Sequence, residues 1–389
     1  MIPPSLNPLL PFHFMKLFLP TFAFLLAAAA LCGQSTERLN RTKAAQTPAE
    51  NLRESAQTLV EEAIIKTSSL LKVNVTYQAF SPHIPWQKDS PGARRGLGVV
   101  LKGNEILVTA QMVADATYIE LELPESGQKL TAKVKAVDYE ANVALLVAQD
   151  AEQAKPFFAE LKPMALDTSA RIGDRLSVWQ IGPTGDLIVT PLRIAKVETA
   201  QYFVAGSVFL AYEGIGIVRS EGNSFTLPVV KGGKLAGLLL RYDSKNQVTT
   251  VLPAPIIEHF LKDSADGEYE GFPNLGVEFQ LTLDEQFREY LGLKPGEGGM
   301  YVGQVLKGMT ADKLGLKEGD IITEVNGFAI DSRGNYKDPQ YGALSMSHLV
   351  RGRAFVGDEL KVKVRRGGKD ELLEGKLLRK DPSEMIVSP

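Results

Sequence analysis

Cysteine and histidine are scarce in this chain. Among its 389 residues there are one cysteine and four histidines. The single cysteine, Cys32, excludes an intramolecular disulfide and any metal site built from several cysteines. The histidines are His13, His83, His259 and His348, and their spacing is not that of metal ligands. We therefore expect neither a metal site nor a cofactor.

Neither sign of charge is in large excess. The chain has 43 lysines and arginines against 46 aspartates and glutamates, a formal net charge of -3. This balance gives no electrostatic basis for a nucleic-acid partner, which would require a basic surface. The hydrophobic content of 44% is typical of globular proteins, and the length suffices for two or three domains of ordinary size.

A long apolar run occurs at the N-terminus, where Lys16 precedes Leu17–Leu31 and polar sequence follows. The run is shorter than the roughly 20 residues of a membrane span and is typical of a secretory signal. We predict a signal segment over residues 1–33 and an exported chain, periplasmic or secreted, without further membrane contact. Lipid attachment at Cys32 and an uncleaved anchor are the alternatives.

The middle of the chain predicts an all-β module. Residues 34–70 are expected to form a linker and an N-terminal helix. From 71 to 262, short apolar runs alternate with turns rich in glycine and aspartate, as in barrels and sandwiches. The predicted strands include Gly96–Val100, Glu105–Ala110, Ile119–Leu123, Lys133–Val137, Val143–Val147, Arg175–Ile181, Leu187–Val197, Val204–Leu210, Leu227–Val230, Leu235–Leu240 and Gln247–Leu252. A closing helix is expected at Pro255–Leu261, and an acidic linker at 263–271.

Residues 272–380 mix predicted strands with short helices, and 381–389 form a tail. The segment from Leu314 to Gly327 reads LGLKEGDIITEVNG. Gly319 and Asp320 are suited to a turn into a buried strand, and Asn326-Gly327 to a tight hairpin turn. This pattern closely resembles that of PDZ domains.

The PDZ resemblance implies a groove between a strand and a helix that takes a polypeptide segment or C-terminus by strand addition. The peptide-binding residues that it implies are Leu275, Gly276, Val277, Phe279 and Leu349. A loop around Gly276 can bind a carboxylate through backbone N–H groups. The alternative is that these apolar residues only form core. The insertion Asp331–Gly342 is long enough to cover the groove, and His348 is expected on the helix surface.

A strand-rich module followed by a PDZ pattern resembles the HtrA/Deg family of serine proteases. The family strand that ends in the catalytic histidine matches Ile106–Ala110, so the histidine position falls on Gln111. The family motif VDxxxDLALL matches Val137–Leu146, which puts its aspartate at Asn142. The family motif GNSGGP retains Ser224 but continues with Phe225 and Thr226 instead of glycines.

The resemblance implies a mainly β fold class: a trypsin-like double six-stranded β-barrel followed by a PDZ domain. It also implies a homotrimer, the assembly common among active relatives. The catalytic chemistry does not follow, because a serine hydroxyl needs an adjacent base. The amide of Gln111 cannot serve, and losing proton transfer alone costs about 10²–10⁴-fold in rate.

We therefore predict a pseudoprotease in which Gln111, Asn142 and Ser224 mark a degenerate triad. Its PDZ domain would bind polypeptides, and the chain would act as scaffold, adaptor or regulator in protein quality control. The alternative is an active serine endopeptidase with Ser224 as nucleophile and a non-standard base. The candidate bases are His83, His259 and nearby carboxylates.

Overall fold

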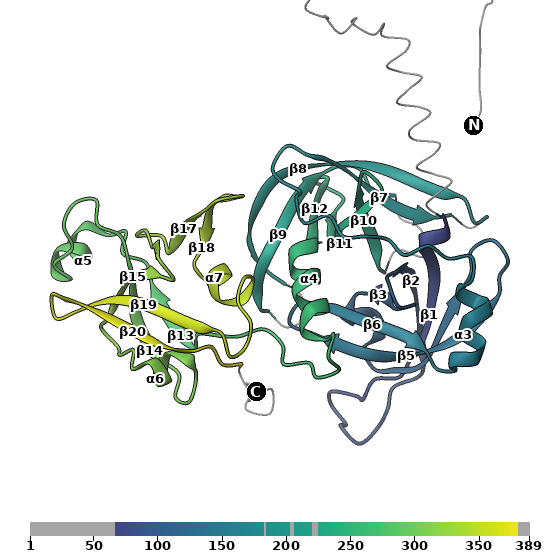
Figure 1. Cartoon of the computed structure of the whole chain (residues 1–389), viewed down its shortest axis with the longest axis horizontal. Coiled ribbons are helices and arrows are strands. Elements are labelled where there is room, and N and C mark those ends of the chain that lie inside the picture. Colours follow the sequence, from purple (N-terminus) through teal and green to yellow (C-terminus); the bar gives the residue numbers. More distant parts are fainter. Residues whose placement is uncertain (1–66, 183, 203–205, 220–224, 380–389) are drawn as a thin grey trace, which may run out of the picture. The chain divides into compact units, whose positions relative to one another are not determined.

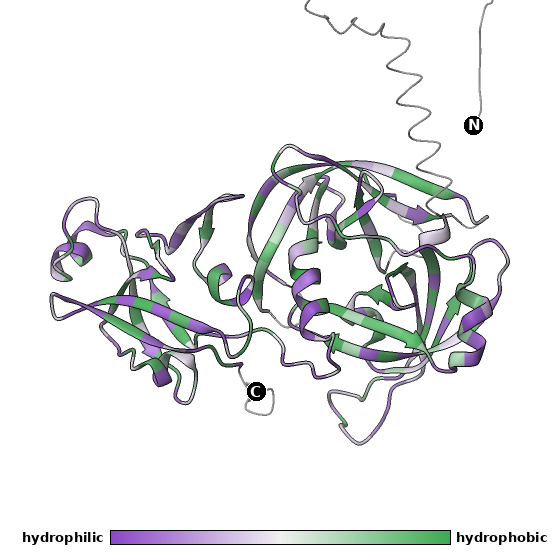
Figure 2. Ribbon diagram, in the orientation of Figure 1, coloured by the Kyte–Doolittle hydropathy of each residue, from purple (hydrophilic) through white to green (hydrophobic). Residues whose placement is uncertain are grey.

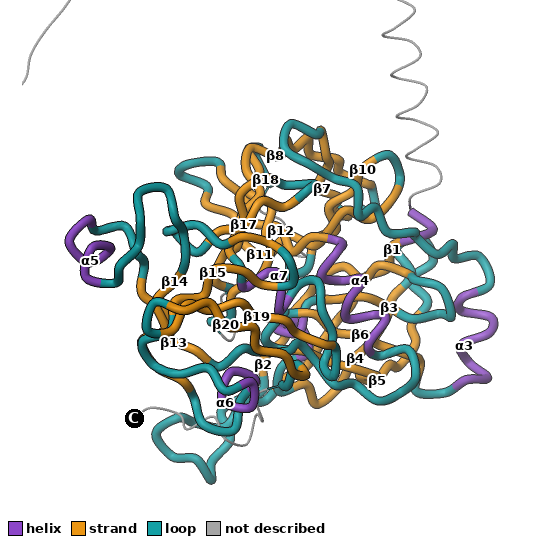
Figure 3. Tube along the Cα trace, turned by 60° about the vertical axis from the view of Figure 1, so that its left-hand side comes forward, coloured by secondary structure: helices purple, strands orange, loops and turns teal. Residues whose placement is uncertain are grey.

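The computed structural model describes residues 67–182, 184–202, 206–219 and 225–379 (Figure 1). The predicted signal segment, the N-terminal helix, Ser224 and the C-terminal tail lie outside the described residues. Strands dominate and helices are short (Figure 3). Within the described ranges, no helix has the length and apolar character needed to cross a membrane.

The first module is a closed six-stranded barrel with strand order β1-β2-β3-β6-β5-β4. Its strands are β1 (Leu70–Tyr77), β2 (Gly92–Val100), β3 (Ile106–Val108), β4 (Ala116–Glu122), β5 (Lys129–Asp138) and β6 (Val143–Ala148). Burial along β1 follows the period of two expected for a strand, with Val73 and Val75 facing inward. On the other face Lys72 forms an ion pair with Glu122 at 3.2 Å.

Short helices accompany this barrel. They are η1 (Thr67–Ser69), α2 (Ala110–Val113) and α3 (Ala151–Phe158). The sequence pattern does not predict α3, which contains Pro156. The helix forms because Asp150 caps it by accepting from Glu152 N at 2.9 Å, while Phe157 and Phe158 are buried in the barrel core.

The second module is another closed six-stranded barrel, ordered β10-β11-β12-β9-β8-β7. Its elements are β7 (Arg175–Ile181), β8 (Leu187–Gln201), β9 (Val208–Ile215), β10 (Leu227–Lys231), β11 (Lys234–Asp243), β12 (Val248–Pro253) and the closing helix α4 (Ala254–Asp263). The strand predicted at Val204–Leu210 is misplaced. The strand β9 begins at Val208, and just before it Ser207 O accepts from Tyr202 N at 2.8 Å.

The C-terminal module contains a six-stranded sheet with the path β13-β14-β15-β19-β20, and β16 pairs with β15. Its elements are β13 (Val277–Gln280), α5 (Glu285–Tyr290), β14 (Met300–Val305), α6 (Thr310–Leu314), β15 (Ile321–Val325), β16 (Phe328–Ala329), α7 (Ser347–Arg351), β19 (Glu359–Arg366) and β20 (Lys369–Lys376). Hydrophilic and hydrophobic residues alternate along most of β19 (Figure 2). The hairpin turn is as predicted, with φ of 47° at Asn326 and 83° at Gly327.

The insertion after β16 forms a separate hairpin of β17 (Asn335–Asp338) and β18 (Gly342–Ser345). Its tip contacts the second barrel: Tyr341 Oη lies 3.2 Å from Tyr212 Oη, and Gln340 Nε2 donates to Thr168 O at 3.1 Å. The insertion was expected to cover the groove, but none of its residues is among those that line the groove cavity. The hairpin instead packs toward β8 and β9.

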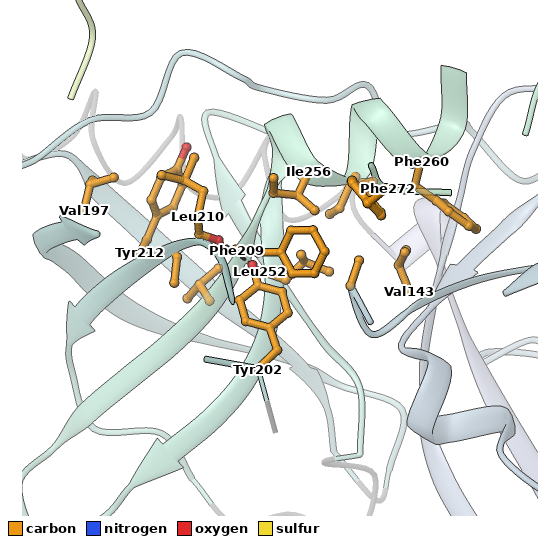
Figure 4. Close-up of a cluster of buried hydrophobic side chains, with 14 of the residues drawn as sticks. Val143, Val197, Tyr202, Phe209, Leu210, Tyr212, Leu252, Ile256, Phe260 and Phe272 are labelled. Carbon is orange, nitrogen blue, oxygen red and sulfur yellow. Dashed lines mark hydrogen bonds between the residues drawn. The ribbon is translucent and has the colours of Figure 1, made fainter. Parts of the chain in front are cut away.

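One hydrophobic core continues from the second barrel into the C-terminal module (Figure 4). The ring of Phe209 meets that of Phe272 edge-on, with centres 4.8 Å apart and planes at 71°. Tyr202 lies 5.3 Å from Phe209 on the barrel side. The predicted fold class, a double barrel followed by a PDZ-type module, is confirmed.

The first barrel depends on its buried strand residues. Leu121 in β4 is fully buried, whereas Leu372 in β20 is 59% exposed. We expect Leu121→Ala to lower the free energy of unfolding by about 2–5 kcal/mol, because it leaves a cavity in the core. Leu372→Ala should change it by less than about 0.5 kcal/mol. Urea denaturation of both variants measures this, and equal effects would contradict the assignment of β4 to the core.

Candidate functional site

The two side chains expected at the base and carboxylate positions lie next to each other. Gln111 belongs to α2, and Asn142 ends the turn between β5 and β6. The backbone N–H of Gln111 donates to Asn142 Oδ1 at 2.9 Å, and Asn142 Nδ2 donates to Gln111 Oε1 at 3.0 Å. Asn142 is 3% exposed with φ of 53°, a left-handed conformation that asparagine tolerates. The two predicted positions therefore meet through a reciprocal amide pair.

Neither amide has the acid–base chemistry of an imidazole, because an amide oxygen takes up no proton near neutral pH. Met112, the next residue of α2, is fully buried and has no titratable group. A methyl group added at Gly96 would lie 2.9 Å from Thr226 N and 3.3 Å from Met112 Sδ, so β2, α2 and this segment approach closely. Whether Gln111 or Met112 is aligned with the family histidine, α2 supplies no general base.

The segment that follows Ser224 is held between the two barrels. Ser224 itself lies outside the described residues. Leu97 N in β2 donates to Thr226 O at 3.1 Å. Thr226 Oγ1 lies 2.8 Å from Thr109 Oγ1, and both threonines are buried. This hydroxyl pair joins the end of β3 to the start of β10.

Phe225 follows Ser224 directly, and its ring lies close to Arg94 of β2. The Arg94 guanidinium carbon lies 3.8 Å from the Tyr77 ring centre and 5.6 Å from the Phe225 ring centre. Phe225 also lines a cavity of about 370 Å³ together with Leu227 of the second barrel.

Two carboxylates of the β5–β6 turn are engaged by other parts of the chain. Asp138 is 2% exposed and accepts from Ala141 N at 2.7 Å and from Tyr269 Oη at 2.5 Å. Burial, followed by the charge of Asp138, raises the pKa of Tyr269 and keeps its hydroxyl a donor. Glu140 forms an ion pair with Arg351 of α7. Each carboxylate is therefore bound by a group from outside the first barrel.

His259 is a packed core residue of α4. It is 4% exposed and lies between the rings of Phe272 and Phe355, with centres at 4.4 and 4.0 Å. Its Nε2–H donates to Ala354 O at 2.9 Å. Burial lowers the pKa of His259, which favours the neutral ring. His83, the other candidate base, is exposed in the loop between β1 and β2.

The prediction that His348 is a surface residue is wrong. Its side chain is 4% exposed and stacks on Tyr336 with ring centres 6.5 Å apart. Packing of the β17–β18 hairpin against α7 covers this face of the helix. Burial lowers the pKa of His348 to about 4, while Asp338 opposes the shift and Arg353 adds to it.

A cavity of about 300 Å³ lies between β13, α7 and the residues Gly206–Val208 of the second barrel. The predicted residues that line it are Leu275, Gly276, Val277 and Phe279. Met346 and Val350 line it from the opposite side. β13 is the end strand of its sheet and pairs with β14 alone among the described strands, so its other edge presents unpaired backbone groups.

Leu349, predicted on the opposite wall, does not line the cavity. It is 3% exposed and belongs to the core cluster. Residues three and four apart share a helix face, so an error of one position exchanges Leu349 for Val350. Sequence reasoning also missed Arg351, which lines the cavity next to Val350. Arg351 could have been predicted, because it is a basic residue in the last turn of the helix that was expected to form the groove.

In the glycine loop before β13, one backbone N–H donates to a side chain of the same loop. Gly276 has φ of 73°, and a Cβ there would lie 2.3 Å from Met309 Cβ, so glycine is required. Gly276 N donates to Asn274 Oδ1 at 2.9 Å. An N–H expected to bind a carboxylate is therefore occupied by the Asn274 amide, a contact that the sequence did not predict.

Residues 273–377 match the PDZ domain family. Protease Do-like 4, mitochondrial, of Arabidopsis thaliana is 26% identical over 323 residues, covering 82% of this chain and 60% of that protein. Putative protease Do-like 13 of Arabidopsis thaliana is 27% identical over 314 residues, covering 78% of this chain and 62% of that protein. The chain thus spans about three fifths of the length of these relatives.

Solved structures with the same fold include the HtrA-type protease AlgW with a tripeptide and with a decapeptide. The tripeptide structure has a TM-score of 0.62 at 19% identity and covers 84% of this chain and 98% of AlgW. The decapeptide structure has a TM-score of 0.61 at 19% identity and covers 83% and 99%. This similarity establishes the double-barrel and PDZ arrangement.

The buried His348 makes stability depend on pH. Its pKa is lowered from 6.5 to about 4, so the unfolded chain binds a proton that the folded chain does not. The stability is complete above pH 6.5 and falls as the pH drops toward 4, by about 3 kcal/mol in all. His348→Phe should flatten this dependence, measured by urea denaturation across that range. An unchanged slope in the variant would show that His348 is not responsible.

Proposed function

We propose that this chain, which has the HtrA/Deg-type architecture of a trypsin-like double barrel with a C-terminal PDZ domain, is a catalytically inactive member of that group that binds polypeptides. The observation that carries the proposal is the reciprocal amide pair of Gln111 and Asn142. The pair occupies the expected base and carboxylate positions with groups that do not exchange protons at neutral pH.

The surroundings of the pair support the loss of hydrolysis. Phe225 and Thr226 replace glycines that would leave room and backbone donors beside a developing oxyanion. Asp138 and Glu140 are bound to Tyr269 and Arg351 and are not available as bases. A serine without a positioned base is a poor nucleophile.

Polypeptide binding in the groove is supported by its geometry. The wall of Val277 and Phe279, the unpaired edge of β13 and a cavity of about 300 Å³ suit an extended chain added to the sheet. The AlgW structures of the same fold contain peptides. We assign the groove residues Leu275, Gly276, Val277 and Phe279 to this role and replace the predicted Leu349 by Val350.

The cellular part of the proposal rests on the N-terminus and the resemblance. The apolar run Leu17–Leu31 supports export to the periplasm or the cell exterior. Two relatives are named as mitochondrial and chloroplastic proteins. We propose a scaffold, adaptor or regulatory role in protein quality control, as a homotrimer of the kind that the family resemblance implies.

An active endopeptidase remains the competing proposal, because the relatives are named as proteases. A fluorophosphonate probe tests it directly. We expect the full chain to label no more than its Ser224→Ala variant, since the loss of proton transfer alone reduces reactivity by about 10²–10⁴-fold. An active HtrA-type protease in the same buffer shows that the probe works. Labelling or casein cleavage that Ser224→Ala abolishes would refute inactivity.

Two matched variants on β13 test the groove. Val277 lines the cavity, whereas Gln280 is an exposed residue of the same strand. Peptides selected by the full chain from a random ten-residue phage library serve as probes. We expect Val277→Asp to weaken binding at least about 10-fold, because a carboxylate would have to be desolvated against apolar contacts. Gln280→Asp should leave it unchanged. Equal affinities in fluorescence anisotropy would place the peptide elsewhere.

A further inference from the structure

Arg351 is the charged residue among the described residues that line the groove cavity. It is the last residue of α7, and its side chain is 12% exposed. Its guanidinium carbon lies 4.6 Å from the centre of the Phe209 ring of β9. The guanidinium is therefore held in place by packing, in a site where charge interactions are less screened than in water.

The guanidinium is only partly satisfied. Its Nη2 forms an ion pair with Glu140, whose side chain is 15% exposed. Its Nε is buried and has no hydrogen-bond partner in the described part of the chain. A buried donor without a partner is energetically unfavourable. A carboxylate binds a guanidinium best through two parallel N–H groups, and Nε with Nη2 forms one such edge.

The other anion site of the groove is less available. Gly276 N, in the glycine loop, already donates to Asn274 Oδ1 at 2.9 Å. A ligand carboxylate that bound there would have to displace the Asn274 amide. Arg351 lines the cavity with a positively charged side chain whose buried Nε lacks a partner, so an acidic group in the groove gains most at Arg351.

We infer that Arg351 selects polypeptide segments that carry an aspartate or glutamate side chain, and that Glu140 competes with this side chain for the guanidinium. The inference rests on the proposed binding of polypeptides in the groove. A ligand carboxylate on the Nε–Nη2 edge shares Nη2 with Glu140, so the two anions repel each other and bind at each other's expense.

The competition connects the groove to the turn that carries the amide pair. Glu140 lies two residues before Asn142, which is bound to Gln111. An acidic ligand weakens the ion pair between Arg351 and Glu140. By thermodynamic linkage, loss of that ion pair increases the affinity for acidic ligands. A neutral ligand that occupies the same groove has no such effect.

The experiment uses peptides selected on the full chain from a random ten-residue phage library. Each peptide is resynthesised with its acidic residues changed to the corresponding amides, and both forms are titrated by fluorescence anisotropy. We expect the acidic form to bind at least about 10-fold more tightly to the unmodified chain. Glu140→Gln should tighten binding of the acidic form about 5-fold or more and leave the amide form unchanged.

Arg351→Met should abolish the preference while retaining binding of the amide form, and Arg351→Lys should retain part of it. If Arg351→Met is misfolded by circular dichroism, Glu140→Gln still decides the question. Hydrogen exchange of the amides from Tyr139 to Asn142 should rise with the acidic peptide and not with its amide form.

Different outcomes contradict peptide binding in the groove and the selection of acidic segments by Arg351. If no peptide binds, or if binding persists in Val277→Asp, the groove is not the site, and both the proposed function and this inference are lost. If peptides bind in the groove but the acidic and amide forms bind equally, only the inference is overturned. It is also overturned if Glu140→Gln changes both forms alike.

Discussion

The turn between β5 and β6 is the point on which the arrangement of this molecule depends. Three of its side chains are fixed by three different parts of the chain. Asp138 is bound by Tyr269 of the linker, Glu140 by Arg351 of α7, and Asn142 by Gln111 of α2. These partners are distant in the sequence. The turn therefore contacts the first barrel, the linker and the C-terminal module at the same time.

The amide pair of Gln111 and Asn142 joins α2 to the β5–β6 turn through uncharged groups. In a serine protease the catalytic imidazole is hydrogen-bonded to a carboxylate, and the imidazole changes its protonation during each turnover. Gln111 and Asn142 hold α2 against the turn by two hydrogen bonds at 2.9 and 3.0 Å that do not change near neutral pH.

Local sequence signals predicted the parts of this fold that depend on neighbouring residues. The alternation along β1 and the Asn326-Gly327 turn follow from side-chain period and from allowed φ values. Errors arose where tertiary contacts decide. The β9 strand starts after a turn closed by Tyr202, and His348 is buried because a hairpin packs on its helix. The pairing of Arg351 with Glu140, 211 residues apart, cannot be predicted from the local sequence around either residue.

The contacts of Asp138 connect the first barrel to the linker and to the C-terminal module. Its carboxylate is 2% exposed and depends on Tyr269 and on Arg379 near the end of the C-terminal module, whose Nη2 lies 3.6 Å away. Replacing Tyr269 and Arg379 by residues without donors would leave this buried carboxyl group with fewer partners, at a cost of several kcal/mol. The stability of the first barrel is therefore tied to the linker and to the end of the C-terminal module.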